Sequence, residues 1–307
     1  MGKTIEVIIP TYKPGKQFIH LIELLKQQSY PVSKISIENT EVKYWTAEME
    51  QLSELIEVTH IGKDYFDHGR TRDHAARRAQ GDYILFMTQD AIPADQYLVE
   101  NLVKAMDQPN VAVSYGRQLP SAHSNLIEQF TRNFNYPEKS RVKFKKDIPE
   151  LQIKTFFCSD VCAMYDRRIY LEQGGFEKKI IFNEDMVFAG RLVEAGFGVA
   201  YAADARVIHS HNYSALEQFH RNFDLGVSQA DFSDIFGKVK STGEGIRLVK
   251  KTAAWLIRQK RPWCVIQLFW QSGWKFLGYS LGKRYRSLPG WLILRCTMNQ
   301  NYWNGVI

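Results

Sequence analysis

Short apolar runs and helical patterns alternate along the first third of the chain. A continuous run of about five apolar residues is typical of a strand buried on both faces, whereas apolar positions three and four apart are typical of an amphipathic helix. The predicted strands cover residues 6–10, 35–37, 56–60, 83–87 and 111–115. The predicted helices cover residues 16–28, 45–55, 72–80 and 95–107. This alternation predicts an α/β fold in which helices flank a mostly parallel central sheet.

Polar residues follow three of the predicted strands at the point where each strand ends. These are the segments Pro10-Thr11-Tyr12, Glu38-Asn39-Thr40 and Gln89-Asp90. The carboxyl ends of parallel strands meet at one edge of a sheet, and ligands of open α/β sheets bind there. We therefore expect a ligand site at this edge.

Composition narrows the classes of protein to consider. The 307 residues are 45% hydrophobic and 24% charged, which excludes a disordered chain, a fibrous repeat and a small disulfide-stapled scaffold. Neither the GxGxxG motif nor GxxxxGK followed by Ser or Thr occurs, so dinucleotide-binding Rossmann enzymes and P-loop ATPases are disfavoured. The four cysteines form no CxxC pair, no run of 18 apolar residues occurs, and the first residues lack a signal-peptide pattern. We expect an intracellular protein with reduced cysteines.

The distribution of charge divides the chain into two parts. Residues 1–236 carry 27 Lys and Arg against 32 Asp and Glu, whereas residues 237–307 carry 13 Lys and Arg and the single acid Glu244. Six of the seven tryptophans also lie in this second part. We predict a globular domain over 1–236 and a basic, aromatic tail of amphipathic helices over 237–307.

Three partners are considered for this basic tail. Basic amphipathic helices with boundary tryptophans bind the surface of membranes that contain anionic lipid, and this is the interpretation we favour. The alternative is that the aromatic side chains pack on the first domain or form a homodimer contact. Nucleic acid is disfavoured because no nucleic-acid-binding motif accompanies the charge.

Four motifs in a fixed order carry a resemblance to a known family. They are VIIPTY at residues 7–12, ISIENT at 35–40, RDHAARRAQGDYILFMTQD at 72–90 and FNEDM at 182–186. Together they resemble glycosyltransferase family 2, the inverting nucleotide-sugar enzymes with a GT-A fold. The stretches FDHGRTRD and TQDAIP are most similar to those of bacterial rhamnosyltransferases.

The resemblance implies a nucleotide-binding region and a metal site. The implied nucleotide-binding residues are Pro10, Thr11, Tyr12, Glu38, Asn39, Arg72 and Gln89. Asp90 occupies the last position of the family's DxD motif, whose carboxylate holds a divalent cation, here Mg²⁺ or Mn²⁺. Thr88 stands in place of the first Asp. One carboxylate can suffice for Mg²⁺, which keeps several waters and binds phosphate oxygens as well.

The resemblance also implies a catalytic base. In the FNEDM motif Asp185 matches the base that takes the proton from the acceptor hydroxyl, and Glu184 is its acidic neighbour. Two acids at the start of a helix also interact favourably with the helix dipole, and both roles are compatible.

Two histidines and one cysteine-containing segment complete the candidate site. In an extended segment His209 and His211 point the same way, so both are candidate metal ligands or diphosphate contacts. Residues 157–162 resemble the strand that faces the acceptor sugar, where Ser159 or Asp160 would bind a hydroxyl group. A zinc site built from Cys158, Cys162 and the two histidines is disfavoured, because nothing beyond the spacing supports it.

We expect an inverting glycosyltransferase that moves L-rhamnose from dTDP-rhamnose onto a lipid-linked cell-wall or capsular glycan. It would work as a peripheral protein at the cytoplasmic face of the plasma membrane. One alternative is the same fold with a UDP-hexose donor. The other is a non-catalytic member that binds a glycan or a partner, which the missing carboxylate at Thr88 would permit.

Overall fold

The structure is a computed structural model that describes residues 2–240 and 242–306. It contains two compact units. Unit 1 comprises residues 1–119, 136–178 and 184–209, and unit 2 comprises residues 120–135, 179–183 and 210–307. The predicted boundary after residue 236 does not coincide with the border of these units, because the helix before it, Ala215–Asp231 (α9), packs against Pro262–Gly282 (α12) in the tail.

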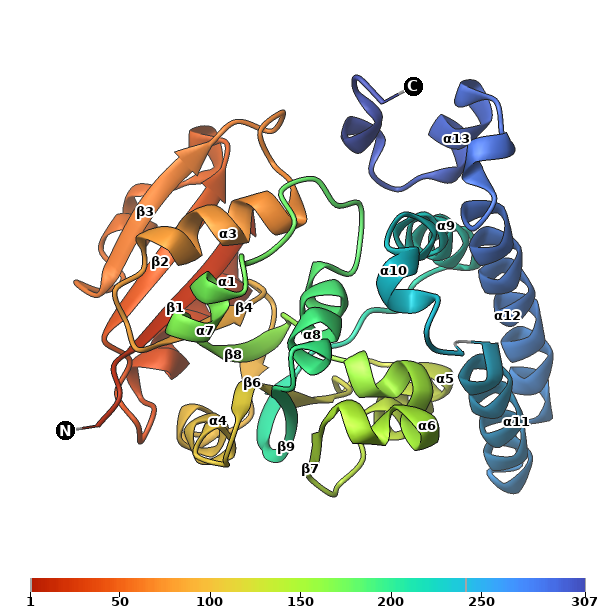
Figure 1. Cartoon of the computed structure of the whole chain (residues 1–307), viewed down its shortest axis with the longest axis horizontal. Coiled ribbons are helices and arrows are strands. Elements are labelled where there is room, and N and C mark those ends of the chain that lie inside the picture. The colour runs from red at the N-terminus through yellow and green to blue at the C-terminus, as the bar shows by residue number, and fades with distance from the viewer. Residues whose placement is uncertain (1, 241, 307) are drawn as a thin grey trace. The chain divides into compact units, whose positions relative to one another are not determined.

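Unit 1 is built on a nine-stranded mixed sheet (Figure 1). The strand order is β3-β2-β1-β4-β8-β6-β9-β5, and β7 pairs with β9. The strands are β1 Ile5–Tyr12, β2 Lys34–Thr40, β3 Ile56–Ile61, β4 Tyr83–Met87, β5 Ile92–Pro93, β6 Val111–Leu119, β7 Arg141–Lys143, β8 Cys162–Asp166 and β9 Gly198–Ile208. Strands β1 to β4 form a parallel block, while β8 runs antiparallel to both β4 and β6. The α/β class with a central sheet flanked by helices is confirmed, and β8 makes the sheet mixed.

Helices cover both faces of the parallel block. On one face, Ile5, Val7 and Ile9 of β1 pack with α1 and α4 in one apolar cluster. Helix α3 contacts β1 and β2 (Figure 1). The helices of unit 1 are α1 Lys16–Lys26, α2 Ala47–Glu50, α3 His68–Arg78, α4 Leu98–Met106, α6 Ile148–Leu151, α7 Arg167–Glu172 and α8 Glu184–Glu194. Its 3₁₀ turns are Val42–Tyr44, Lys145–Asp147 and Gln152–Phe156.

Three predicted elements differ from the structure. The helix predicted over 45–55 is only the single turn α2, in which Met49 alone is buried, so little apolar contact supports a longer helix. Helix α3 begins four residues earlier than predicted, because the Asp67 carboxylate accepts the backbone N–H groups of Gly69 and Arg70 and caps the helix there. The segment predicted as a strand from residue 157 is a loop as far as 161, and β8 begins at Cys162.

The register of the parallel block confirms the predicted polar edge. Pro10 lies opposite Glu38, Thr11 opposite Asn39, and Tyr12 opposite Thr40. Strand β4 ends beside β1, so the turn that carries Gln89 and Asp90 leaves the sheet at the same edge.

Unit 2 is helical. Its helices are α5 Leu126–Asn135, α9, α10 Ser233–Phe236, α11 Thr242–Arg258, α12 and α13 Gly290–Cys296, with 3₁₀ turns at Tyr285–Ser287 and Gln300–Trp303. Helices α9 and α12 approach closely because glycines line their contact. Gly278 and Gly282 face backbone carbonyls of α9, and Gly226 faces the backbone of α12.

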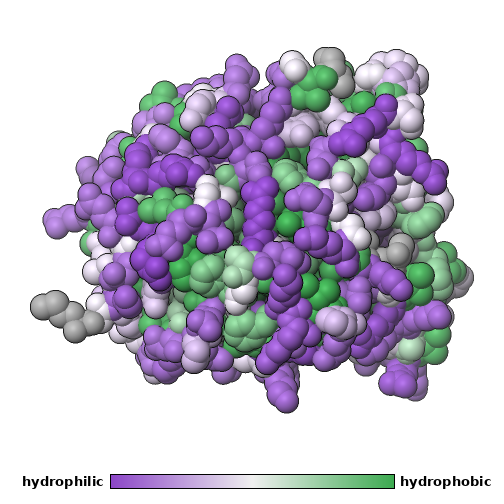
Figure 2. All heavy atoms as spheres, in the orientation of Figure 1, coloured by the Kyte–Doolittle hydropathy of each residue, from purple (hydrophilic) through white to green (hydrophobic). Residues whose placement is uncertain are grey.

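The tail has an apolar surface of its own. Figure 2 shows apolar side chains at the edge of the molecule where Figure 1 places α12. Within the residues described, no helix is both long enough and apolar enough to span a membrane.

Candidate active site

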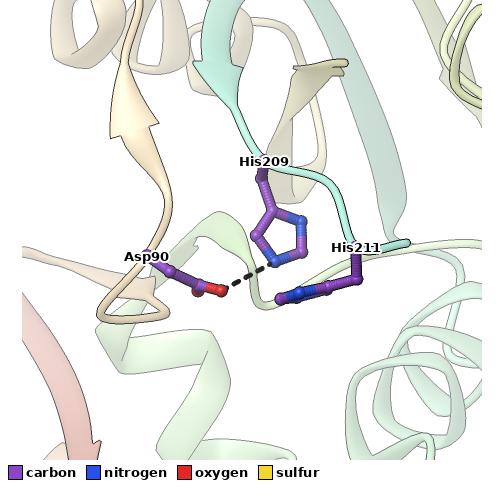
Figure 3. A group of neighbouring side chains, drawn as sticks. All are labelled: Asp90, His209 and His211. Carbon is purple, nitrogen blue, oxygen red and sulfur yellow. Dashed lines mark ion pairs between the residues drawn. The ribbon is translucent and has the colours of Figure 1, made fainter. Parts of the chain in front are cut away.

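One carboxylate and two imidazoles converge beyond the end of β4. Asp90 Oδ2 lies 3.5 Å from Nε2 of His209, and the candidate ligand atoms of Asp90, His209 and His211 all lie within 4.8 Å of one another (Figure 3). Asp90 comes from the turn after β4, His209 directly follows β9, and His211 is two residues further along the chain. This is the one group of three or more candidate ligands found among the residues that the structure describes, and it contains neither Cys158 nor Cys162.

Hydrogen bonds fix the orientation of His209. The amide Nε2 of Gln118 donates to Tyr136 Oη at 2.6 Å and to Ser159 Oγ at 2.9 Å, which directs its Oε1 to Nδ1 of His209 at 3.0 Å. Because an amide oxygen only accepts, His209 Nδ1 carries a proton, and in the neutral ring Nε2 then offers its lone pair toward Asp90. A carboxylate oxygen and an imidazole lone pair that face each other suit a bound cation, and a hydrogen bond to the other ring nitrogen is typical of histidine ligands.

The turn that carries Asp90 is held to the end of β1. Gln89 Oε1 accepts the backbone N–H of Tyr12 at 2.9 Å, and Gln89 Nε2 donates to the Tyr12 carbonyl at 3.1 Å. The side chain of Gln89, predicted to bind nucleotide, is therefore engaged with the backbone and positions Asp90. The hydroxyl of Thr88, which replaces the first Asp of the DxD motif, is buried without a hydrogen-bond partner.

The predicted nucleotide-binding residues lie together at the ends of β1 and β2. Thr11 Oγ1 donates to Asn39 Oδ1 at 3.0 Å, and both side chains are buried. Pro10 is partly exposed, and Tyr12 is 40% exposed with its ring 5.5 Å from that of Tyr44. Tyr44 lies just before the helix predicted over 45–55, and no sequence pattern pointed to it.

Glu38 is fully buried at this edge. Arg78 of α3 donates to Glu38 Oε1 and, at 2.9 Å, to Thr59 Oγ1. Burial raises the pKa of Glu38 to about 7, although the charge and hydrogen bond of Arg78 lower it. Arg78 therefore belongs to this region, although no sequence pattern pointed to it.

Two acids flank the guanidinium of Arg72, and a third acid, Asp185, lies beside them. Arg72 Nη1 donates to Glu184 Oε1 at 3.0 Å, and Arg72 Nε lies 3.8 Å from Asp160 Oδ2. The backbone N–H of Asp160 donates to Asp185 Oδ2 at 3.1 Å. Arg72, predicted to reach the nucleotide, thus lies between two carboxylates, and its nucleotide contact stays a prediction.

Burial and mutual repulsion shift the titration of these acids. Burial, followed by the negative charge of Glu184, raises the pKa of Asp185 to about 7. Burial and the charge of Asp185 raise the pKa of Asp160 well above its usual range, against the lowering effect of Arg72. A carboxylate with a pKa near neutrality is suited to act as a general base.

Two consecutive residues connect the two clusters. Ser159 accepts from Gln118, which orients His209, and the backbone N–H of Asp160 holds Asp185. Both were predicted to bind the acceptor sugar, and the structure gives both these supporting contacts within the protein. The geometry thus joins a candidate cation site to a candidate base through one dipeptide.

Comparison with known proteins identifies the family of the chain. The model of the glycosyl transferase family 2 matches residues 6–174. The chain is 39% identical over 306 residues to the O-antigen chain rhamnosyltransferase RfbN of Salmonella typhimurium strain LT2, covering 98% of this chain and 96% of the relative. It is 36% identical over 308 residues to the O-antigen chain rhamnosyltransferase WbaN of Salmonella anatum, with the same coverage.

Solved structures share the fold. A mannosyltransferase from Pyrobaculum calidifontis, in complex with GDP-Man and Mn²⁺, has a TM-score of 0.57 at 14% identity and covers 95% of this chain and 79% of its own. TarS residues 1–349 of S. aureus, in complex with UDP-GlcNAc, has a TM-score of 0.52 at 14% identity and covers 92% of this chain and 91% of its own. By its family model and its full-length relatives, this chain belongs to glycosyltransferase family 2 and is a glycosyltransferase.

Proposed function

We propose that this glycosyltransferase moves L-rhamnose from dTDP-rhamnose onto a lipid-linked cell-surface glycan of the O-antigen class, with inversion at the anomeric carbon. The observation that carries the proposal is the likeness along the whole chain to two O-antigen chain rhamnosyltransferases. The acid cluster at the start of α8 supports the chemistry.

The proposed reaction is a single displacement. The acceptor hydroxyl attacks C1 of rhamnose, Asp185 takes the hydroxyl proton, and the bond between C1 and the diphosphate oxygen breaks, so that dTDP leaves. The pKa of about 7 supports Asp185 in this role, because the ionised carboxylate is then available at neutral pH. Glu184 is engaged with Arg72, so we assign proton transfer to Asp185 alone.

The fit of Asp90, His209 and His211 to a divalent cation supports metal dependence. The cation would neutralise negative charge on the diphosphate of the leaving group. Two imidazoles in the donor set favour Mn²⁺ over Mg²⁺, because Mg²⁺ prefers oxygen ligands. At the nucleotide end, we propose that Pro10, Thr11, Tyr12, Glu38 and Asn39 line the base pocket.

A donor panel tests this proposal. Purified protein is incubated with dTDP-rhamnose, UDP-glucose, UDP-galactose or GDP-mannose, with Mn²⁺, with Mg²⁺ or with EDTA, and nucleotide release is measured. We expect slow release of dTDP alone, with Mn²⁺ the better metal and no turnover in EDTA or in Asp90→Ala. Turnover of a UDP-hexose instead would contradict the rhamnose assignment, and no turnover with no nucleotide binding would contradict the transferase activity.

We also propose that the tail attaches the enzyme to the cytoplasmic face of the membrane, where a lipid-linked acceptor is found. Apolar residues recur along the outer face of α12 at intervals of three, four and seven positions. They are Trp263, Ile266, Phe269, Trp270, Phe276 and Leu277, and each is exposed. Trp263 is 80% exposed, and contiguous exposed apolar side chains of this kind are typical of an interaction surface.

Cations flank this apolar face at both ends. Exposed basic residues precede α12 at Arg258, Lys260 and Arg261 and follow it at Lys283, Arg284 and Arg286. No acidic residue occurs after Glu244. A second copy of the chain would bring the same excess of positive charge, whereas anionic phospholipid offers both apolar chains and negative charge. We therefore assign the face to an anionic bilayer surface.

Vesicle co-sedimentation tests the attachment. We expect binding to vesicles of phosphatidylglycerol and phosphatidylcholine, weaker binding to phosphatidylcholine alone, and at least about tenfold weaker binding of a Trp263→Ser, Trp270→Ser double variant. The matched control is Tyr97→Ser, which removes an exposed aromatic ring from unit 1. Equal sedimentation of the double variant, or a dimer in solution that the double variant abolishes, would contradict this assignment.

A further inference from the structure

Arg72 is placed unlike a residue that binds a substrate phosphate. Only 5% of its surface is exposed, and its guanidinium lies between the carboxylates of Glu184 and Asp160. Nη1 also donates to the carbonyl of His68, one turn earlier in α3, at 3.1 Å. Nη1 and Nε are thus both directed at groups of the protein. The geometry therefore points inward, to the acids.

The contacts of Arg72 lead to the proposed base through Asp160. Tyr165 Oη donates to Asp160 Oδ1 at 2.8 Å, while Arg72 Nε approaches the other oxygen of the same carboxylate. The backbone N–H of Asp160 then donates to Asp185 Oδ2, and the N–H of Met186 donates to Asp185 Oδ1 at 2.7 Å. Both carboxylate oxygens of Asp185 thus accept a backbone N–H, one of them from the residue whose carboxylate lies 3.8 Å from Arg72 Nε.

We propose that Arg72 is a positioning residue, which fixes Glu184 and Asp160 so that the carboxylate of Asp185 keeps its orientation and its charge. This inference rests on the proposed function in one respect, the assignment of Asp185 as the base. It assigns to Arg72 a role in proton transfer instead of the nucleotide contact predicted from sequence.

The sign of the electrostatic effect follows from the neighbours of Asp185. Arg72 lowers the pKa of Asp185, whereas Glu184 raises it. Asp185 in turn raises the pKa of Asp160, of the Cys158 thiol and of the Tyr165 hydroxyl. The ionisable groups that face Asp185 are therefore Glu184, Asp160, Arg72, Tyr165 and Cys158. Arg72 is the one cation in this group, so its loss should move the titration of Asp185 to higher pH.

The test is the pH profile of rhamnosyl transfer in wild type, Arg72→Gln and Arg72→Lys. In Arg72→Gln we expect the acidic limb of the kcat/KM profile to shift to higher pH by about one unit or more. The lost rate should be recovered at alkaline pH. The Arg72→Lys variant keeps the charge and should move the limb less. The KM for dTDP-rhamnose should stay within about twofold in both variants.

Two further variants make the result specific. Arg77 lies on the same helix and forms an ion pair with Asp73 at 2.7 Å. Its replacement in Arg77→Gln should leave the acidic limb of the kcat/KM profile unchanged. Glu184→Gln removes a negative charge beside Asp185. It should move the acidic limb of the kcat/KM profile to lower pH, opposite to the effect of Arg72→Gln. This variant keeps the test possible if Arg72→Gln fails to fold. A raised KM for the donor with an unmoved limb in Arg72→Gln, or an unmoved limb in Glu184→Gln, would overturn the proposal.

Failure of this inference and failure of the proposed function are distinguishable. Wild-type transfer by Asp185→Asn would remove the base assignment, and the role of Arg72 with it. If Asp185→Asn loses transfer but the acidic limbs of the other variants do not move, the assignment of Asp185 as the base stands. The positioning role of Arg72 alone is then overturned.

Discussion

Replacing Gly226 by alanine should push two helices of unit 2 apart. Gly226 lies within α9, and a Cβ atom built there would be 2.5 Å from the carbonyl oxygen of Tyr279 in α12 and 2.9 Å from the backbone nitrogen of Lys283, which caps the end of α12. Ordinary contact begins near 3.4 Å. The obstructing atoms are backbone and no side-chain rotation relieves them, so α12 would have to move by about 1 Å.

The expected magnitude follows from two opposing effects. Overpacking of a well-packed contact costs about 1–3 kcal/mol or more, because the displaced helix also loses contacts on either side. Alanine is favoured over glycine within a helix by up to about 1 kcal/mol, which offsets part of this cost. The displacement involves the whole α9–α12 contact, so we expect a net loss of about 2 kcal/mol in the free energy of unfolding.

Thermal unfolding monitored by circular dichroism measures this change. For a chain of this size a loss of 1 kcal/mol lowers the midpoint by about 2–4 °C, so Gly226→Ala should unfold several degrees below wild type. Gly273→Ala is the control, because nothing lies within 4 Å of a Cβ atom on Gly273 of α12. That variant should unfold at the same temperature or slightly higher. Equal midpoints for Gly226→Ala and wild type would refute the reasoning.

Three further predictions concern the site. Transfer should require the ionised form of Asp185, so kcat/KM should fall about tenfold per pH unit below about pH 7; a rate that is flat down to pH 5 would contradict the raised pKa. Gln118→Leu removes the acceptor of the His209 Nδ1 proton and should weaken Mn²⁺ binding about 10–100-fold in calorimetry, whereas Gln129→Leu, whose amide bonds the Ser124 carbonyl, should leave it unchanged. Thr88→Asp restores the first carboxylate of the DxD motif and should tighten Mn²⁺ binding; unchanged affinity would show that position 88 does not face the cation.

The parts of the fold that follow from local pattern were predicted well. The strands of the parallel block and the polar residues at their ends are contiguous in sequence, so apolar runs and turn residues were enough to locate them. The predicted helix over 45–55 was wrong for a local reason, since its apolar residues have too little core to pack against. The antiparallel strand β8 depends on partners far along the chain, and no pattern in residues 157–166 reveals them.

Of the supporting residues of the site, Gln118 was missed and Arg72 was predicted in another role, as a nucleotide contact, for a related reason. Gln118 lies 91 residues from His209, and Arg72 lies 112 residues from Glu184, so neither contact leaves a local signal. A glutamine at the end of a strand is ordinary in a sequence, and an arginine on an alanine-rich helix does not reveal which group it will contact. The motif residues Asp90 and Asp185 could be named from their order along the chain, whereas the groups that orient them required the fold.

The most direct test of the central claim compares two aspartates in rhamnosyl transfer. Initial rates are measured with dTDP-rhamnose and a lipid-linked glycan acceptor for wild type, Asp185→Asn and Asp204→Asn, whose side chain is exposed on β9. The account predicts an inverted rhamnosyl product, a rate about 10²–10⁴-fold lower in Asp185→Asn, and an unchanged rate in Asp204→Asn. Transfer at the wild-type rate by Asp185→Asn, or a product with retained configuration, would contradict it.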